Sequence, residues 1–174
     1  CEKNCPSGVS VPEIIKQVRK DMVGIGSCHP AFKGMNEVLQ KHTNIYAEGE
    51  PEDFERERNR KAAYVYFIGC VGSYREDEST LATLELLDRI RLDYTLIDEV
   101  CCSGVLEDVG YTINENLVRK NLDLIAATGA RSVITGCPYC YRTFRNRPQY
   151  GELKEKGVEV VHISQFLKDL DLGV

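Results

Sequence analysis

The 174-residue chain has no long apolar run, no excess of basic residues and no internal repeat. No stretch approaches the ~20 apolar residues that a membrane-spanning helix needs, so we expect no membrane span. The net charge of −5 is spread along the chain and gives no surface suited to nucleic acid. No secretory signal is visible, and we expect a cytoplasmic protein. Because 43% of the residues are hydrophobic, the chain can form a core of its own.

The chain also lacks an initial methionine and starts at Cys1. The segment Cys1-Glu-Lys-Asn-Cys5-Pro6 matches the C-x3-C-P tail of a bacterial ferredoxin motif, whose first two cysteines would lie upstream. We therefore expect residues 1–60 to be the tail of a ferredoxin-like module, made of helices and a charged linker. Cys1 and Cys5 are its expected third and fourth cluster ligands.

Eight cysteines are the main chemical feature of the chain. A secreted disulfide framework is one explanation for so many cysteines in a short sequence. Against it, no signal peptide is visible and the chain is long enough to fold around its own core. Clustered cysteines then favour metal or redox chemistry. Five of them form one spaced pattern: Cys70, the adjacent pair Cys101-Cys102, and Cys137-x-x-Cys140.

Hydrophobic periodicity predicts helices first, and then strands that alternate with helices. Helices are expected at Pro12–Val23 and Ala31–His42, and Glu48–Arg60 is either a linker or a solvated helix with ion pairs. The expected strands are Ala63–Ile68, Tyr94–Ile97, Ser132–Thr135 and Val158–His162. The helices expected among them are Ser79–Arg91, Asn114–Thr128, Pro138–Arg145 and Ser164–Leu170. Residues 61–174 are thus expected to form an α/β domain with a Rossmann-like parallel sheet and helices on both faces, preceded by the short helical remnant.

Each of the first three expected strands is followed by cysteine. Because ligands collect outside the carboxyl ends of parallel strands, we expect all five cysteines of the pattern to meet at one edge of the sheet. A cubane iron–sulfur cluster or a tetrahedral zinc ion needs only four thiolates, and the fifth allows a larger or less symmetric cluster. Gly69, Gly104 and Gly136 lie beside the cysteines, where small residues let backbone N–H groups point at a cluster.

The pattern resembles a known family. Cys70, then Cys101-Cys102-Ser103, then Cys137-Pro-Tyr-Cys140 is similar to the CCG cysteine-rich domain of heterodisulfide reductase catalytic subunits and of iron–sulfur subunits of lactate, glycolate and glycerol-3-phosphate oxidoreductases. Further matches are Phe67-Ile-Gly69-Cys70, with Tyr74 beyond it, and Val161-His-Ile-Ser-Gln-Phe-Leu167. The resemblance covers about Ala62 to Leu170, and the segment from Cys5 to Ile15 is similar to the ferredoxin part often found before this domain.

The resemblance implies that these five cysteines hold a [4Fe-4S] cluster, which in the family can be noncubane, and that a small disulfide or a protein disulfide is reduced there. It implies other subunits of an electron-transfer complex and a ferredoxin-like or flavin-containing electron donor as partners. Two departures are visible. Ser103 stands where the family has glycine, with Gly104 one residue later. Many members also carry two motifs, and this sequence carries one.

Three other functions stay open. Cys137-Pro-Tyr-Cys140 alone is a glutaredoxin-like redox pair, but too little chain follows it, and the adjacent pair would be unexplained. Zinc could bind four of the thiolates in a structural docking domain. An electron-relay subunit of a dehydrogenase complex would need the cluster but no substrate of its own.

Several residues outside the five-cysteine pattern also have expected roles. His162, at the end of the last expected strand, is our candidate catalytic proton donor to a leaving thiolate, or else a core histidine. Tyr141 is expected to pack over the cluster and exclude water. Cys28 is interpreted as a packed thiol outside the motif. The arginines that follow the motif could neutralise an anionic cluster or form a solvated helix face: Arg142, Arg145 and Arg147.

Overall fold

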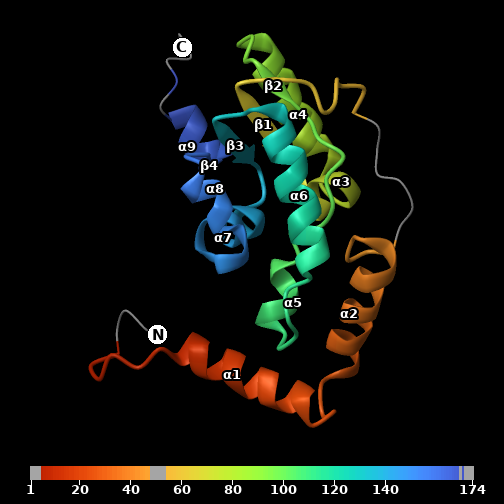
Figure 1. Ribbon diagram of the computed structural model, residues 1–174, viewed down its shortest axis with the longest axis vertical. Coiled ribbons are helices and arrows are strands. Elements are labelled where there is room, and N and C mark those ends of the chain that lie inside the picture. The colour runs from red at the N-terminus through yellow and green to blue at the C-terminus, as the bar shows by residue number, and fades with distance from the viewer. Residues whose placement is uncertain (1–4, 48–53, 169, 171–174) are drawn as a thin grey trace.

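The computed structural model describes residues 5–47, 54–168 and 170 (Figure 1). Four parallel strands form one sheet, in the order β2-β1-β3-β4. They are β1 (Tyr64–Phe67), β2 (Tyr94–Thr95), β3 (Ser132–Thr135) and β4 (Glu159–His162). The expected α/β class with a parallel sheet is confirmed.

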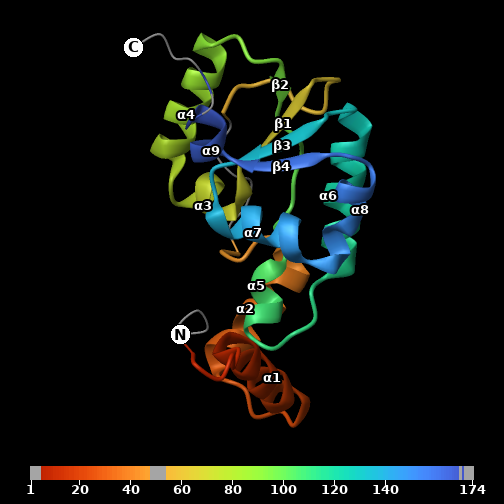
Figure 2. The same ribbon diagram turned by 90° about the vertical axis from the view of Figure 1, so that its left-hand side faces the viewer.

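Helices cover both faces of the sheet, as expected (Figure 2). Alternate side chains of β1 point to opposite faces, which is the period of a strand. Val65 and Phe67 join a core under α6 (Glu115–Thr128), α7 (Pro138–Asn146) and α8 (Gly151–Glu155). Tyr66 and Ile68 join a second core under α4 (Asp77–Arg89) and α9 (Ile163–Lys168).

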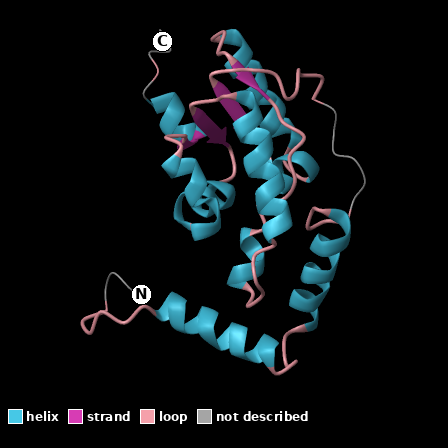
Figure 3. Cartoon of the chain, in the orientation of Figure 1, coloured by secondary structure: helices cyan, strands magenta, loops and turns pink. Residues whose placement is uncertain are grey.

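Two short helices that periodicity did not predict follow the cysteine-bearing strand ends. They are α3 (Gly69–Tyr74) and α5 (Gly104–Asp108). A short 3₁₀ turn, Pro148–Tyr150, and α8 were also not predicted. These pieces have one or two turns each, too few for a helical period to show in sequence. Helices make up more of the described structure than strands do (Figure 3).

Residues 54–60 of the charged segment before the domain form no helix. Residues 48–53 lie outside the described residues. Phe54 is buried in the second core. Arg58 forms a parallel bridge with Leu96, which extends the edge of the sheet beyond the short β2. The helix alternative for residues 54–60 is therefore wrong.

The N-terminal segment contains α1 (Val11–Gly24) and α2 (Pro30–His42), close to the two expected helices. α1 lies beside α5, at the end of the molecule remote from α4 (Figures 1 and 2). Its apolar residues are largely exposed, among them Ile14 and Val18. Within the described residues, every helix is too short or too polar to cross a membrane.

Candidate metal centre

The three strand ends deliver the five cysteines to one edge of the sheet. Cys70 lies in the first turn of α3, which follows β1. Cys101 and Cys102 precede α5, and Cys137 is the N-cap of α7, two residues after β3. Cys140 lies in the first turn of α7. The structure thus brings together the five cysteines that the sequence singles out.

The sulfur atoms form a row of hydrogen-bonded neighbours. Contacts run from Cys70 to Cys101, on to Cys102, then to Cys140 and finally to Cys137. All five are free thiols, and the middle three are buried while Cys70 and Cys137 are half-buried. The two ends of the row are therefore the parts most exposed to solvent.

The row alternates between thiols that donate and sulfurs that accept. Hydrogen bonds from the Cys101 and Cys140 thiols lower the pKa of Cys102 well below its usual value. A hydrogen bond from Cys140 lowers the pKa of Cys137 to about 6, despite partial burial. The pKa values of Cys101 and Cys140 are raised, chiefly by these same thiol contacts and by burial. Cys102 and Cys137 are thus the preferred thiolates, the form that binds metal.

Backbone N–H groups point at three of the sulfurs. The Ser103 N–H donates to the Cys101 Sγ at 3.4 Å. The Gly104 N–H donates to Cys102, and those of Tyr139 and Cys140 donate to Cys137. Such donors stabilise thiolate ligands and tune the potential of a cluster.

The adjacent pair is held by groups that sequence analysis missed. The Cys101 N–H donates to the Thr43 carbonyl at 3.0 Å, and the Tyr150 hydroxyl donates to the Cys102 carbonyl at 3.1 Å. Asn121, fully buried on α6, pairs with both the N–H and the carbonyl of Val100. A lone asparagine on the apolar face of a predicted helix was the available signal for this role.

Cys101 and Cys102 point into different cores although they are neighbours. Cys101 packs with Leu39 and Leu106, and Cys102 packs in the core beneath α6 and α7. The turn that follows requires a left-handed residue, and Ser103 has a φ of 63°. This explains glycine at that position in the resembled family. The fully buried Ser103 hydroxyl accepts the Asn114 N–H at 2.8 Å.

Glu99 supports the loop before Cys70. Its carboxylate accepts the N–H groups of Ile68, at 2.9 Å, and of Gly69. Burial raises the pKa of Glu99 to about 8, although the two N–H groups act in the opposite direction. Gly69 has a φ of 80°, and a Cβ there would lie 3.0 Å from the Cys140 Sγ. Glycine at this position keeps space for the sulfurs.

The other expected cofactor-binding residues lie around the row in different ways. Gly104 faces Thr143, whose hydroxyl also donates to Cys102, so a Cβ there would clash with α7. Gly136 lies against the Tyr66 hydroxyl. Tyr141 is half-buried, its hydroxyl accepts from Arg145 at 2.6 Å, and its ring lies edge-on to His162.

Both ring nitrogens of His162 have partners within the protein. Nε2 donates to the Gly136 carbonyl at 3.0 Å, next to Cys137. Nδ1 accepts from the Ser164 N–H at 3.2 Å and lies 2.8 Å from the Ser164 hydroxyl. This assignment of donor and acceptor follows from the carbonyl and amide partners. The catalytic role of His162 stays a prediction.

The remaining sequence candidates lie apart from the row. The Cys5 Sγ accepts the Val9 N–H at 3.3 Å, and Cys1 lies outside the described residues. The Cys28 thiol contacts the Tyr111 hydroxyl at 3.3 Å. Arg142 and Arg147 form ion pairs with Asp108.

The donor set fits an iron–sulfur cluster. In the described part of the chain, no group of three or more Cys, His, Asp or Glu side chains is already placed around a metal-ion position. The five thiols instead form an extended row with backbone N–H donors beside it. Cysteine thiolates with backbone N–H donors beside them are the type of ligand that would hold an iron–sulfur cluster.

Comparison with known proteins agrees with this chemistry. Residues 64–145 match the family model of the CCG cysteine-rich domain. This segment of the chain is similar to the CCG domain. The match extends from β1 to α7 and so contains all five cysteines of the row. The CCG domain and the iron–sulfur relatives described next support an iron–sulfur cluster as the cofactor.

Relatives that match over most of this chain are described as heterodisulfide reductase subunits or as iron–sulfur proteins. The chain is 28% identical over 184 residues to a subunit of the dihydromethanophenazine:CoB–CoM heterodisulfide reductase of Methanosarcina acetivorans, across 98% of this chain and 44% of the relative. The identity to the Methanosarcina barkeri protein of the same name is 28% over 185 residues, with the same coverage. An uncharacterized iron–sulfur protein of Methanococcus maripaludis is 26% identical across 79% of this chain and 27% of the relative. No solved structure matches.

The chain spans less than half the length of the heterodisulfide reductase subunits that it matches. The findings support an iron–sulfur protein with an electron-transfer role. Cys70, Cys101, Cys102, Cys137 and Cys140 stay the predicted ligands.

Proposed function

We propose that this chain is a subunit of an iron–sulfur oxidoreductase, in which the five cysteines hold a cluster that delivers electrons to a disulfide. The convergence of five free cysteines from three strand ends is the observation that supports this most. Reduction of a disulfide consumes two electrons and two protons and gives two thiols. When bound, a cluster supplies electrons one at a time and irons with affinity for sulfur.

The protein's own groups would hold and tune that site. Backbone N–H groups beside Cys101, Cys102 and Cys137 would compensate the negative charge of the thiolates. The half-buried ends of the row, at Cys70 and Cys137, would face the incoming disulfide. The buried middle of the row would exclude water from the metal.

The proposed enzyme includes polypeptide beyond this chain. The heterodisulfide reductase relatives are subunits of larger enzymes, and each is more than twice as long as the part that this chain matches. We infer that other subunits supply electrons, through a ferredoxin-like or flavin-containing donor. Cys1 and Cys5 would belong to the ferredoxin-like module through which those electrons arrive.

The burial of the middle sulfurs favours a second candidate, an electron relay without a substrate of its own. Cys101, Cys102 and Cys140 are each 5–6% exposed, which leaves a substrate little access to them. A relay needs only a cluster that accepts and donates electrons.

An assay of disulfide reduction separates the two functions. The chain is purified without oxygen and receives electrons from a reduced viologen. Oxidation of the viologen is followed with and without an added small disulfide. A disulfide-dependent reaction with release of two thiols per two electrons supports the enzyme. A cluster that is reduced by viologen but not reoxidised by any disulfide supports the relay.

Two variants test whether the row is the site. Cys102→Ser removes the central thiolate and should abolish or transform the cluster spectrum, since serine is a poor iron ligand. Cys28→Ala is the matched control, because this half-buried thiol contacts Tyr111 and lies outside the row. Iron loss in the Cys28 variant, or a wild-type spectrum in the Cys102 variant, would contradict the assignment.

A further inference from the structure

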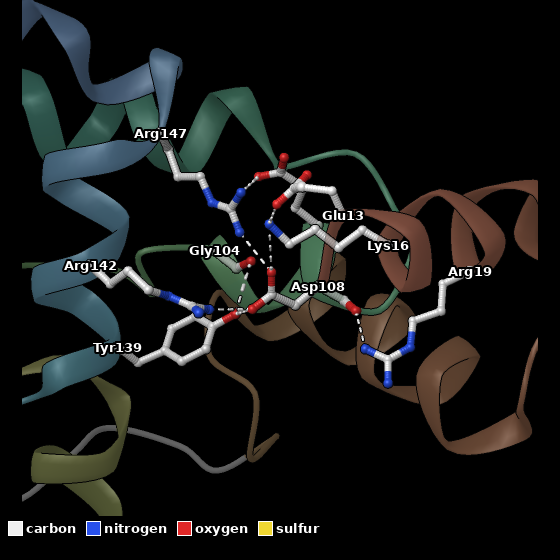
Figure 4. Close-up of polar contacts among 9 residues, drawn as sticks. Glu13, Lys16, Arg19, Gly104, Asp108, Tyr139, Arg142 and Arg147 are labelled. Atoms are coloured by element: carbon white, nitrogen blue, oxygen red, sulfur yellow. Dashed lines mark hydrogen bonds and ion pairs between the residues drawn. The ribbon is translucent and has the colours of Figure 1, made fainter. Parts of the chain in front are cut away.

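Asp108, the last residue of α5, lies between the cysteine-bearing helix α7 and the N-terminal helix α1. Its carboxylate accepts the Tyr139 hydroxyl and the Arg142 guanidinium, and it accepts from Arg147 at 2.7 Å. Lys16 of α1 lies 3.9 Å from the same carboxylate, and Arg19 donates to the Asp108 carbonyl at 2.6 Å. Figure 4 shows the α7 residues on one side of Asp108 and the α1 residues on the other.

Tyr139 is the link from this network to the metal ligands. It stands between Cys137 and Cys140, and its backbone N–H donates to the Cys137 sulfur. Its hydroxyl donates to Asp108 and lies 3.4 Å from the Gly104 carbonyl, in the residue after Ser103. Arg142 stacks on the Tyr139 ring, with its guanidinium carbon 4.7 Å from the ring centre. One side chain therefore joins both cysteine-bearing segments.

The electrostatics favour this arrangement. Burial raises the pKa of Asp108, but Tyr139, Arg142 and Arg147 together outweigh burial, so that its pKa lies below the usual value. The Tyr139 hydroxyl is the donor of the hydrogen bond to the Asp108 carboxylate. A charged acceptor and a neutral donor form a strong, directional hydrogen bond.

We infer that Asp108 is a positioning residue of the metal centre: through Tyr139 it fixes the N–H group that donates to Cys137 and holds the Cys137–Cys140 loop against the Cys101–Cys102 segment. This inference rests on the proposed function. Asp108 touches no predicted ligand itself, and it acts through the residue between two of them. Asp108 also contacts Lys16 and Arg19 of α1, and so it connects the N-terminal segment to the same network.

The first test is the rate at which bound metal is lost to a chelator. Asp108→Ala, Tyr139→Phe and the double variant all keep the five cysteines. We expect each single variant to lose metal about 10-fold faster, as is typical when groups behind metal ligands are removed. Because the two residues act as one unit, the double variant should lose metal no faster than the faster single variant.

A matched control exists on the other face of the sheet. The Tyr94 hydroxyl donates to Asp88 at 2.7 Å, and Arg56 also pairs with Asp88, which reproduces the same residue types away from the cysteines. Asp88→Ala and Tyr94→Phe should lower thermal stability without changing the rate of metal loss. Equal effects of the two pairs on metal loss would overturn the inference.

The second test is the midpoint potential of the cluster in Tyr139→Phe. This change leaves every charge in place and removes only the anchor of the loop. Since N–H donors favour the more negative, reduced state, a looser Tyr139 N–H should lower the potential. An unchanged potential together with unchanged metal loss would show that the network is merely structural.

The two proposals fail in distinguishable ways. A wild-type chain that binds zinc in place of iron would refute the proposed function, and the release experiment on zinc would still decide the role of Asp108. A wild-type chain that binds neither metal would overturn both.

Discussion

At the scale of single residues, the metal centre depends on a few backbone positions as much as on the thiols. Gly69 and Ser103 both adopt left-handed conformations beside cysteines. The Gly69 N–H donates to the Glu99 carboxylate, and the Ser103 N–H donates to the Cys101 Sγ. The five cysteines could be found from sequence because their side chains carry the chemistry. Asn121 and Tyr150 could not, because their roles depend on partners more than 20 residues away.

Gly69→Ala should disrupt the row directly. The added Cβ would lie 3.0 Å from the Cys140 Sγ, and the φ of 80° is strained for alanine. We expect a loss of stability of about 1–3 kcal/mol together with reduced iron content. Gly129→Ala is the control, since its φ is 70° and no atom lies within 4 Å of the new Cβ. Thermal unfolding and iron analysis of both variants measure the effect, and equal iron content in the two would contradict it.

His162→Ala should test whether this histidine is a support or a proton donor. Its Nε2 donates to the Gly136 carbonyl and its Nδ1 is paired with Ser164. We expect a loss of stability of ~1–3 kcal/mol, because a polar partner is removed, with turnover per folded molecule retained. A fall in turnover on the order of 10²-fold at full cluster content would instead identify His162 as the general acid.

At the scale of elements, α5 packs closely against α7 at its start, and the residues just after its end pack closely against α1. Gly104 at its start lies against Thr143 of α7, and Gly110 just after its end lies against the backbone of α1. Periodicity predicted the strands and the long helices, because each repeats its burial pattern over several turns or residues. It could not predict α3 or α5, whose few residues are fixed by cysteine contacts and packing against neighbouring helices. It also could not predict that Phe54 anchors the charged linker in a core.

Gly110→Ala should loosen α1 from the domain. A Cβ at this position, where φ is 98°, would lie 2.5 Å from the Arg19 carbonyl oxygen. We expect a cost of about 1–3 kcal/mol and faster proteolysis within α1. Gly157→Ala, with a φ of 70° and open space around the new Cβ, carries the backbone strain without the clash. Proteolysis of α1 at the same rate in both variants would show that Gly110 does not seat the helix.

At the scale of the whole molecule, the structure joins a parallel sheet, whose strand ends gather thiols, to an N-terminal segment that braces the same edge. Thr43 accepts from Cys101, and α1 contacts Asp108, so the segment before β1 contacts the residues around the cysteine row. Sequence alone predicted the parallel sheet and the two N-terminal helices, but not the contacts between them, because these join residues far apart in the chain, such as Leu39 with Cys101 and Leu106.

The central claim is that the five cysteines hold an iron–sulfur cluster, and the metal content of the chain tests it most directly. Iron, acid-labile sulfide, zinc and the visible absorption spectrum are measured on protein purified without oxygen. The account predicts a coloured protein with broad visible absorption, iron and sulfide in similar amounts, and a lost or transformed spectrum in Cys102→Ser. A colourless protein that holds stoichiometric zinc and no sulfide would contradict it.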